Sequence, residues 1–214
     1  MFQIAILIGL YSYSIFLLGI FGVLNKPTVG ADSLTFLSIS FLLLVKPNIN
    51  NVTRVFSNFT KHLGLLGKFS LVLIILQLFI NFVGALGPEL SFDALWYHLT
   101  IPKIFIEYQR VFHIPGSLLY YSDMPKLIEM LYIPGLMYGN EVFAKLIHYT
   151  FGIGVLIVIF NLARKYLSRD LSLLAVLIFS SNLVFAWQQT TSFIDLGRTF
   201  FETAAFYFLV QFMC

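Results

Sequence analysis

The chain has few charged residues and almost no cysteine. Lys, Arg, Asp and Glu make up 11% of its 214 residues, whereas ordinary globular domains carry about a quarter. The one cysteine, Cys214, excludes an intramolecular disulfide and any metal site built from several cysteines. Glycine-rich phosphate loops and low-complexity segments are also missing from the sequence. These shortages exclude an ordinary soluble domain and a disulfide-stabilised one.

Apolar residues are abundant instead, at 59% of the chain with a mean hydropathy of +0.89. A helix needs about 20 apolar residues to cross about 30 Å of hydrocarbon. The sequence predicts an all-α, polytopic transmembrane helical bundle. Its six candidate spans lie near residues 3–24, 31–45, 69–87, 141–163, 171–187 and 199–214.

The two ends of the chain carry different signals. No Lys or Arg precedes Lys26 and no small-residue cleavage site follows the first apolar stretch, which favours a retained helix over a signal peptide. The last stretch runs into Cys214 without a polar flank. We therefore expect the sequence to be the N-terminal piece of a longer protein.

Charges in the connectors predict the orientation. The connector 46–68 carries four basic residues and no acid, and 164–170 carries three basic residues against Asp170; both should be cytoplasmic under the positive-inside rule. The segment 88–137 has five acidic and three basic residues and is predicted to lie outside. The net charge of +3 is explained by contact with anionic lipid and requires no nucleic-acid partner.

The outer segment is the one long stretch that is neither continuously apolar nor simply basic. Asp93, Tyr97 and Glu107 recur at helical spacing, which predicts an amphipathic helix along the membrane surface. Pro102 has no N–H, so we expect two short helices instead of one. A second interfacial helix is predicted after Pro115-Gly116, with a cap at Ser122 or Asp123, Pro125 in its first turn and its end at Pro134-Gly135.

Two polar stripes begin the helices that follow. Glu141, Lys145 and His148 share one helix face, and so do Asp195, Arg198 and Glu202. Ionisable groups at the edge of hydrocarbon are costly and commonly mark a functional cavity. Glu141 with Lys145 and Arg198 with Glu202 are also good i, i+4 pairs that neutralise one another. Together with Asp93 on the same side, the stripes favour a shared site.

Three motifs carry a resemblance to a known family. They are residues 92–103 (Phe-Asp-Ala-Leu-Trp-Tyr-His-Leu-Thr-Ile-Pro-Lys), residues 122–132 (Ser-Asp-Met-Pro-Lys-Leu-Ile-Glu-Met-Leu-Tyr) and residues 191–196 (Thr-Ser-Phe-Ile-Asp-Leu). They resemble the outer loops of the C-type (GT-C) superfamily of polyprenyl-phosphate-sugar glycosyltransferases, nearest its protein-mannosyltransferase-like and aminoarabinose-transferase-like branch. The resemblance covers about residues 70–214. It divides the chain into 1–68, with two spans and the basic connector, and 69–214, a glycosyltransferase-like core.

The resemblance implies roles for single residues. Asp93 corresponds to the family's loop aspartate, proposed to act as general base or to position a metal or the acceptor, and Asp195 to a second acid. The departing lipid phosphate needs cationic stabilisation, for which the candidates are Lys103, Lys126, Lys145 and Arg198. Tyr97, His98 and His148 complete the expected substrate-binding set. Many relatives have two adjacent acidic residues where this chain has Asp93-Ala94. Whether the site binds a divalent metal therefore stays an open question.

The resemblance therefore implies a multi-pass membrane glycosyltransferase, expected in a bacterial inner membrane with its active loop outside. Its partners would be a polyprenyl-phosphate sugar donor, membrane lipids and a lipid, glycan or protein acceptor. Two alternatives remain open, namely a non-enzymatic transporter or flippase component, and an inactive fragment that binds lipid-linked sugar. A transporter should place polar groups near the membrane midplane, whereas the charged stripes here begin at the outer helix ends.

Overall fold

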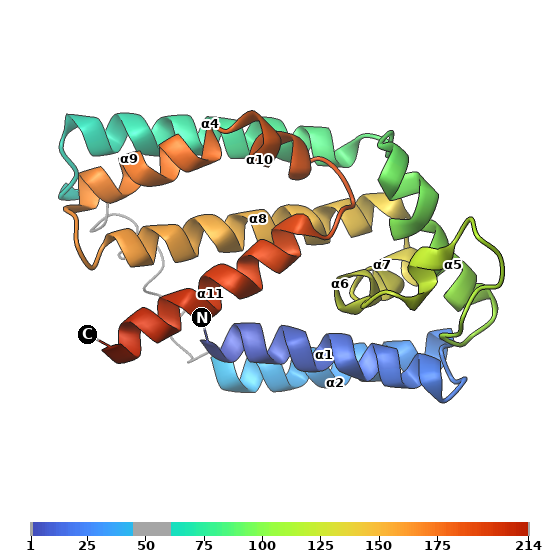
Figure 1. Ribbon diagram of the computed structural model, residues 1–214. Coiled ribbons are helices and arrows are strands. Elements are labelled where there is room, and N and C mark those ends of the chain that lie inside the picture. The colour runs from blue at the N-terminus through green and yellow to red at the C-terminus, as the bar shows by residue number, and fades with distance from the viewer. Residues whose placement is uncertain (1, 45–60, 214) are drawn as a thin grey trace.

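A computed structural model describes residues 2–44 and 61–213, and these residues form helices and connecting turns without a strand (Figure 1). The expected all-helical class is confirmed. The long helices and the helix pair after α8 are α1 (Phe2–Ile20), α2 (Lys26–Leu44), α4 (Leu65–Leu86), α8 (Glu141–Ala163), α9 (Arg169–Ser180), α10 (Leu183–Gln188) and α11 (Asp195–Met213). Lys46 and Arg54 of the predicted basic connector lie outside the described residues.

Among the described residues, three helices are long and apolar enough to cross a membrane. They are Gln3–Ile20 within α1, and the whole of α4 and α8. This finding is compatible with a membrane protein. The stretch expected as one span over 171–187 is two helices, because α9 ends at Ser180 and the Asn182 side chain accepts a hydrogen bond from the N–H of Val184 to start α10.

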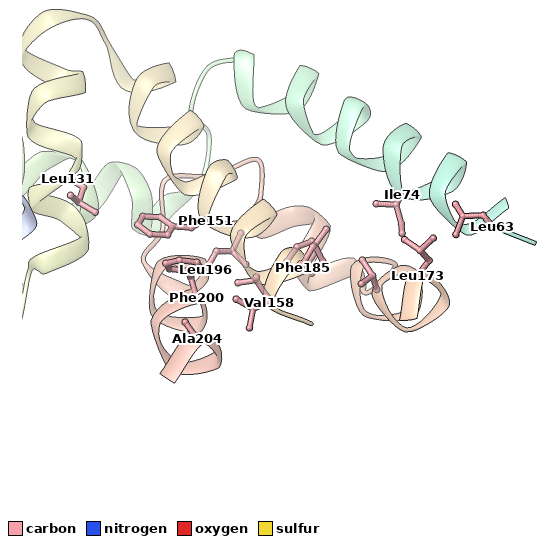
Figure 2. Close-up of a cluster of buried hydrophobic side chains, with 13 residues drawn as sticks. Leu63, Ile74, Leu131, Phe151, Val158, Leu173, Phe185, Leu196, Phe200 and Ala204 are labelled. Atoms are coloured by element: carbon pink, nitrogen blue, oxygen red, sulfur yellow. The ribbon is translucent and has the colours of Figure 1, made fainter. Parts of the chain in front are cut away.

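The helix α8 is the centre of the bundle. Half of its most apolar stretch is buried, against 17% and 22% for α1 and α4. The largest buried cluster joins α8 to α4, α9 and α11, with Phe151 and Phe200 at a ring separation of 5.6 Å (Figure 2). Such packing is what holds helices together in lipid, where the hydrophobic effect between helices is absent.

The connecting segments gather at two ends of the bundle (Figure 1). At the basic end, residues 61–68 meet 164–170, where the N–H of Gly64 donates to the carboxylate of Asp170. At the loop end, the turn after α1 meets the end of α5, since the N–H of Leu24 donates to the carbonyl of Gln109. The loop end therefore collects three connections, residues 21–25, 87–140 and 189–194.

The first part of residues 88–137 forms two short helices, and the division falls at a different residue from the one predicted. The π-helical turn η2 (Ala94–His98) is followed by α5 (Thr100–Glu107), so the break is at Leu99. Pro102 is the third residue of α5, where an N–H has no intrahelical partner and proline is tolerated. The expectation that Pro102 breaks the helix is wrong for this reason.

The second part is built from three short pieces, η3 (Tyr120–Asp123), α6 (Leu127–Met130) and α7 (Tyr132–Tyr138). The predicted cap is wrong: Ser122 accepts the N–H of Ile114, and Asp123 pairs with His113. The predicted end at Pro134 is also wrong, because this proline is the third residue of α7 and the helix continues through Tyr138.

The close contact of α8 and α11 depends on Gly154. A Cβ added there would lie 2.7 Å from Cδ2 of the buried Phe200 ring, whereas one at Gly9 in α1 would meet nothing nearer than 4.0 Å. Gly154→Ala should therefore lower the free energy of unfolding in detergent micelles by about 1–3 kcal/mol through overpacking. Gly9→Ala should be neutral or stabilising through helix propensity. Equal melting temperatures for the two variants would contradict this packing.

Candidate functional site

A cavity of about 350 Å³ opens at the loop end. It is formed where η2, the approach to α6, α6 itself and the connection from α10 to α11 meet. Its walls carry three carboxylates, one lysine and one histidine. The lining residues are Asp93, Tyr97, His98, Tyr121, Met124, Pro125, Lys126, Glu129, Trp187, Gln188, Phe193, Ile194 and Asp195.

The π-helical turn sets three of these side chains on one side. The N–H of Leu99 donates to the carbonyl of Ala94, five residues back, at 2.9 Å. In an ordinary α-helix of 3.6 residues per turn, Asp93 and His98 would point about 140° apart. The wider turn rotates residue i+5 back over residue i, so Asp93, Tyr97 and His98 all line the cavity. Single π-turns occur frequently at functional sites.

The floor of the cavity is a buried charged group. His98 Nδ1 lies 3.0 Å from Oε1 of Glu129, and Lys126 Nζ lies 3.7 Å from the same oxygen. The three residues are 5%, 2% and 5% exposed. Burial lowers the pKa of Lys126, and the charge and hydrogen bonding of Glu129 oppose that shift. The other oxygen of Glu129, Oε2, is buried without a hydrogen-bond partner among the described residues.

The mouth of the cavity carries the two aspartates that the sequence proposed. Asp93 and Asp195 are both exposed. Asp195 begins α11, and its Oδ2 accepts a hydrogen bond of 3.1 Å from Nε2 of Gln188. Trp187 packs edge-on against Phe193 with ring centroids 5.2 Å apart. The mouth thus combines two carboxylates with an aromatic pair.

The connection from α10 to α11 is fixed from several directions. His148, fully buried in α8, lies 2.9 Å from the carbonyl oxygens of Gln188 and Thr191 through Nδ1, and its Nε2 accepts the N–H of Leu196 at 3.1 Å. Glu89 accepts both the N–H and the hydroxyl of Ser192, at 2.8 and 2.7 Å. These bonds hold Asp195 in place at the cavity mouth.

The close approach of α6 to α11 depends on Gly197. A Cβ on this residue would lie 2.8 Å from Cδ1 of Ile128 in α6. The hydroxyl of Tyr132 also donates to the carbonyl of Phe193, across the same junction. The buried Glu129 group and Asp195 are therefore brought together by direct backbone and side-chain contact.

Four of the residues proposed from the sequence do not line this cavity. Lys103 forms an ion pair of 3.1 Å with Glu141, and Arg198 pairs with Glu202 on the exposed face of α11. Lys145 is 2% exposed, and its Nζ donates to the carbonyls of Gly84, Gly87 and Pro88, which satisfies the C-terminal end of α4. His148 contacts the connection instead of the cavity. Three polar stripes were predicted to share one cavity. The loop and the start of α11 line it, and the stripe on α8 does not.

A metal ion does not fit the donor groups present. In residues 2–44 and 61–213, no group of three or more His, Cys, Asp and Glu side chains is placed to hold one. The carboxylate of Glu129 faces Lys126 and His98, and that of Asp195 faces an amide. We therefore assign no role to a divalent metal ion in this cavity.

Three residues that hold or line the site were not predicted from the sequence, namely Glu89, Glu129 and Gln188. Glu129 is the third residue after Lys126, a spacing that places the two on one helix face, and this signal could have identified the pair. The partner of Glu89, Ser192, is distant in sequence. The partner of Gln188, Asp195, is brought to it by the non-helical connection between α10 and α11. No periodicity in the sequence points to them.

Two apolar cavities lie between α1 and α8. Their volumes are about 850 and 600 Å³, and both are lined by Ile4, Ile8, Tyr11, Phe143 and Ile147 of α1 and α8. The second is also lined by Leu131, two residues after Glu129, and by Phe200 of α11. The segment around α6 therefore separates a polar cavity from an apolar groove.

No protein-family model, curated protein sequence or solved structure matches this chain.

Tyr97 should ionise at unusually high pH. Burial, aided by the charge of Asp93, raises the pKa of Tyr97 to about 12. Because an unfolded tyrosine titrates near pH 10, this group's contribution to stability is fully present below about pH 10 and is lost as the pH rises towards 12. The ultraviolet absorbance of phenolate, compared between wild type and Tyr97→Phe, should show the missing step near pH 12. A missing step near pH 10 would contradict the burial.

Lys145 and Lys103 provide a matched pair for separating structural from surface charges. Lys145→Met leaves the carbonyls at the end of α4 without their donor and should cost about 1–3 kcal/mol of unfolding free energy. Lys103→Met removes an ion pair whose side chains are 51% and 35% exposed and should cost less than about 1 kcal/mol. Thermal melting of the two variants in the same detergent checks the order. A larger loss for Lys103→Met would contradict the assignment.

Proposed function

We propose that the chain is a membrane glycosyltransferase, or the catalytic part of one, that transfers a sugar from a polyprenyl-phosphate donor. The acceptor is a lipid, a glycan or a protein on the outer face of a bacterial inner membrane. In this proposal the chain crosses the membrane six times, with α2, the α9–α10 pair and α11 completing the three long apolar helices. The observation that carries the proposal is the meeting of Asp93, Asp195 and Lys126 in one cavity.

The reaction needs a proton acceptor beside the acceptor hydroxyl. As that oxygen forms its bond to the anomeric carbon, the bond from this carbon to the phosphate oxygen breaks, and its electron pair leaves with the lipid phosphate. The hydroxyl proton passes to the carboxylate of Asp93, which acts as general base. Asp93 is exposed at the cavity mouth, so both acceptor and water have access to it.

The leaving phosphate needs a positive charge. Lys126 is the one lysine or arginine among the residues that line the cavity. Since Lys126 is buried and only 3.7 Å from Glu129, its ammonium group has a fixed position from which to stabilise an anion. Lys103, Lys145 and Arg198 do not line this cavity and are not part of the proposed phosphate site.

The lipid chain of the donor has a suitable place beside the cavity. Two apolar cavities share their α1 and α8 walls, and the one between α1, α8 and α11 is lined by Leu131, two residues after Glu129 of the buried group. A prenyl chain there would keep its hydrocarbon in the membrane while its phosphate reaches Lys126. The arrangement supports a donor that is half lipid and half sugar, and it disfavours a water-soluble nucleotide sugar.

The position of the charged groups favours transfer over transport. A transporter binds its substrate near the membrane midplane, on broken helices. In the described residues the cavity lies instead at the loop end, beside the start of α11. A binding site at one surface is what transfer between a membrane donor and an external acceptor requires.

Asp93→Asn should abolish sugar transfer by the full-length protein in proteoliposomes supplied with polyprenyl-phosphate sugar. The amide cannot take a proton, so we expect kcat to fall by about 100-fold or more while membrane insertion is unchanged. The control is Asp123→Asn, whose carboxylate is 56% exposed and pairs with His113 outside the cavity. Wild-type turnover by Asp93→Asn, or an equal loss in Asp123→Asn, would refute the role of Asp93.

A further inference from the structure

The buried pair His98–Glu129 lines the same cavity as Asp93 and has no role in the reaction described above. A buried carboxylate oxygen, Oε1 of Glu129, lies 3.0 Å from Nδ1 of the imidazole. His98 lines the cavity, and no described residue forms a hydrogen bond to its Nε2. A carboxylate on Nδ1 fixes the ring and leaves Nε2 as a proton acceptor, which is the arrangement used by acid–base histidines in general.

Glu129 has unused capacity to stabilise a positive imidazole. Its Oε2 is buried and has no hydrogen-bond partner among the described residues, and Lys126 is no closer than 3.7 Å to Oε1. A buried carboxylate that is incompletely paired favours positive charge on its neighbour. An imidazole that gains a proton at Nε2 supplies this charge at 3.0 Å.

We propose that His98, oriented by Glu129, receives the proton that leaves the acceptor hydroxyl. This inference rests on the proposed function. The O–H bond of the acceptor breaks as the new bond to the anomeric carbon forms. Asp93 takes the proton first and passes it across the cavity to Nε2 of His98, giving an imidazolium that faces Glu129. After the product leaves, the imidazolium releases its proton to water.

General acid–base chemistry favours an imidazole as the final acceptor, because an imidazole is a stronger base than a carboxylate. The π-helical turn places Asp93 and His98 in the lining of the same cavity, as the second step requires.

Other titratable groups face the pair and would respond to the same pH change. On the turn itself these are Asp93 and Tyr97, and the elements packed against it add Lys126, Tyr132, His148 and Asp195. The chain also contains a natural control, the pair His113–Asp123, with a separation of 2.8 Å but side chains 64% and 56% exposed. It has the same chemistry without the cavity.

The test measures sugar transfer against pH for full-length protein in proteoliposomes supplied with polyprenyl-phosphate sugar. His98→Gln and Glu129→Gln should each lower kcat about 100-fold with little change in KM, and the double variant should be no worse than the weaker single one. In His98→Gln the acid limb of the profile should move to lower pH, because a carboxyl then holds the proton. Glu129→Asp should recover part of the rate, and His113→Gln and Asp123→Asn should behave as wild type.

Additive losses, an unmoved acid limb, or an equal effect in the His113–Asp123 controls would overturn the proposal. Should the Gln variants fail to fold, nitrogen NMR on protein labelled at its four histidines decides instead. The His98 signals, identified by their response to Glu129→Asp, should show a proton on Nδ1 and reversible protonation of Nε2. A proton fixed on Nε2 would overturn the proposal. A wild-type chain that transfers no sugar contradicts the proposed function, and the NMR result then still decides the behaviour of His98.

Discussion

The site depends on one backbone hydrogen bond, from the N–H of Leu99 to the carbonyl of Ala94. Because this bond spans five residues, the turn from Ala94 to His98 is wider than an α-helical turn, and Asp93 and His98 face the same cavity. With ordinary helical spacing the aspartate and the histidine would diverge. A π-turn is less favourable than an α-turn and is kept where it serves a site.

The surrounding polar network explains why this turn meets the start of α11. Glu89 holds Ser192, His148 holds the carbonyls before α11, and Lys145 closes the end of α4. Each is a buried polar group with several hydrogen bonds, which offset the cost of removing it from water. The charged residues at the loop end thus have two separate tasks, since some hold the scaffold and others line the cavity.

The sequence predicted the helical class and, among six expected spans, the three helices that are long and apolar enough to cross a membrane. Of the nine residues it assigned to one site, five line the cavity, namely Asp93, Tyr97, His98, Lys126 and Asp195. These features follow from local composition and from motifs. It could not assign the tasks of Lys145 and His148, because helical spacing shows which face a residue occupies and not what lies opposite. The helix boundaries at Pro102 and Pro134 were misplaced for a related reason, since proline ends a helix from the interior but fits its first turn.

In the proposed function, a polyprenyl-phosphate sugar occupies the cavity between η2 and α11, and its lipid chain lies in the neighbouring apolar groove. The most direct measurement is photocrosslinking of the full-length protein in proteoliposomes with a donor that carries a photoreactive group beside the phosphate. If the donor binds in this cavity, peptides around Lys126 and around residues 187–195 should be labelled, and unmodified donor should compete the labelling away. Labelling that is confined to the lipid-facing side of α4, or that does not respond to competition, would contradict binding in this cavity.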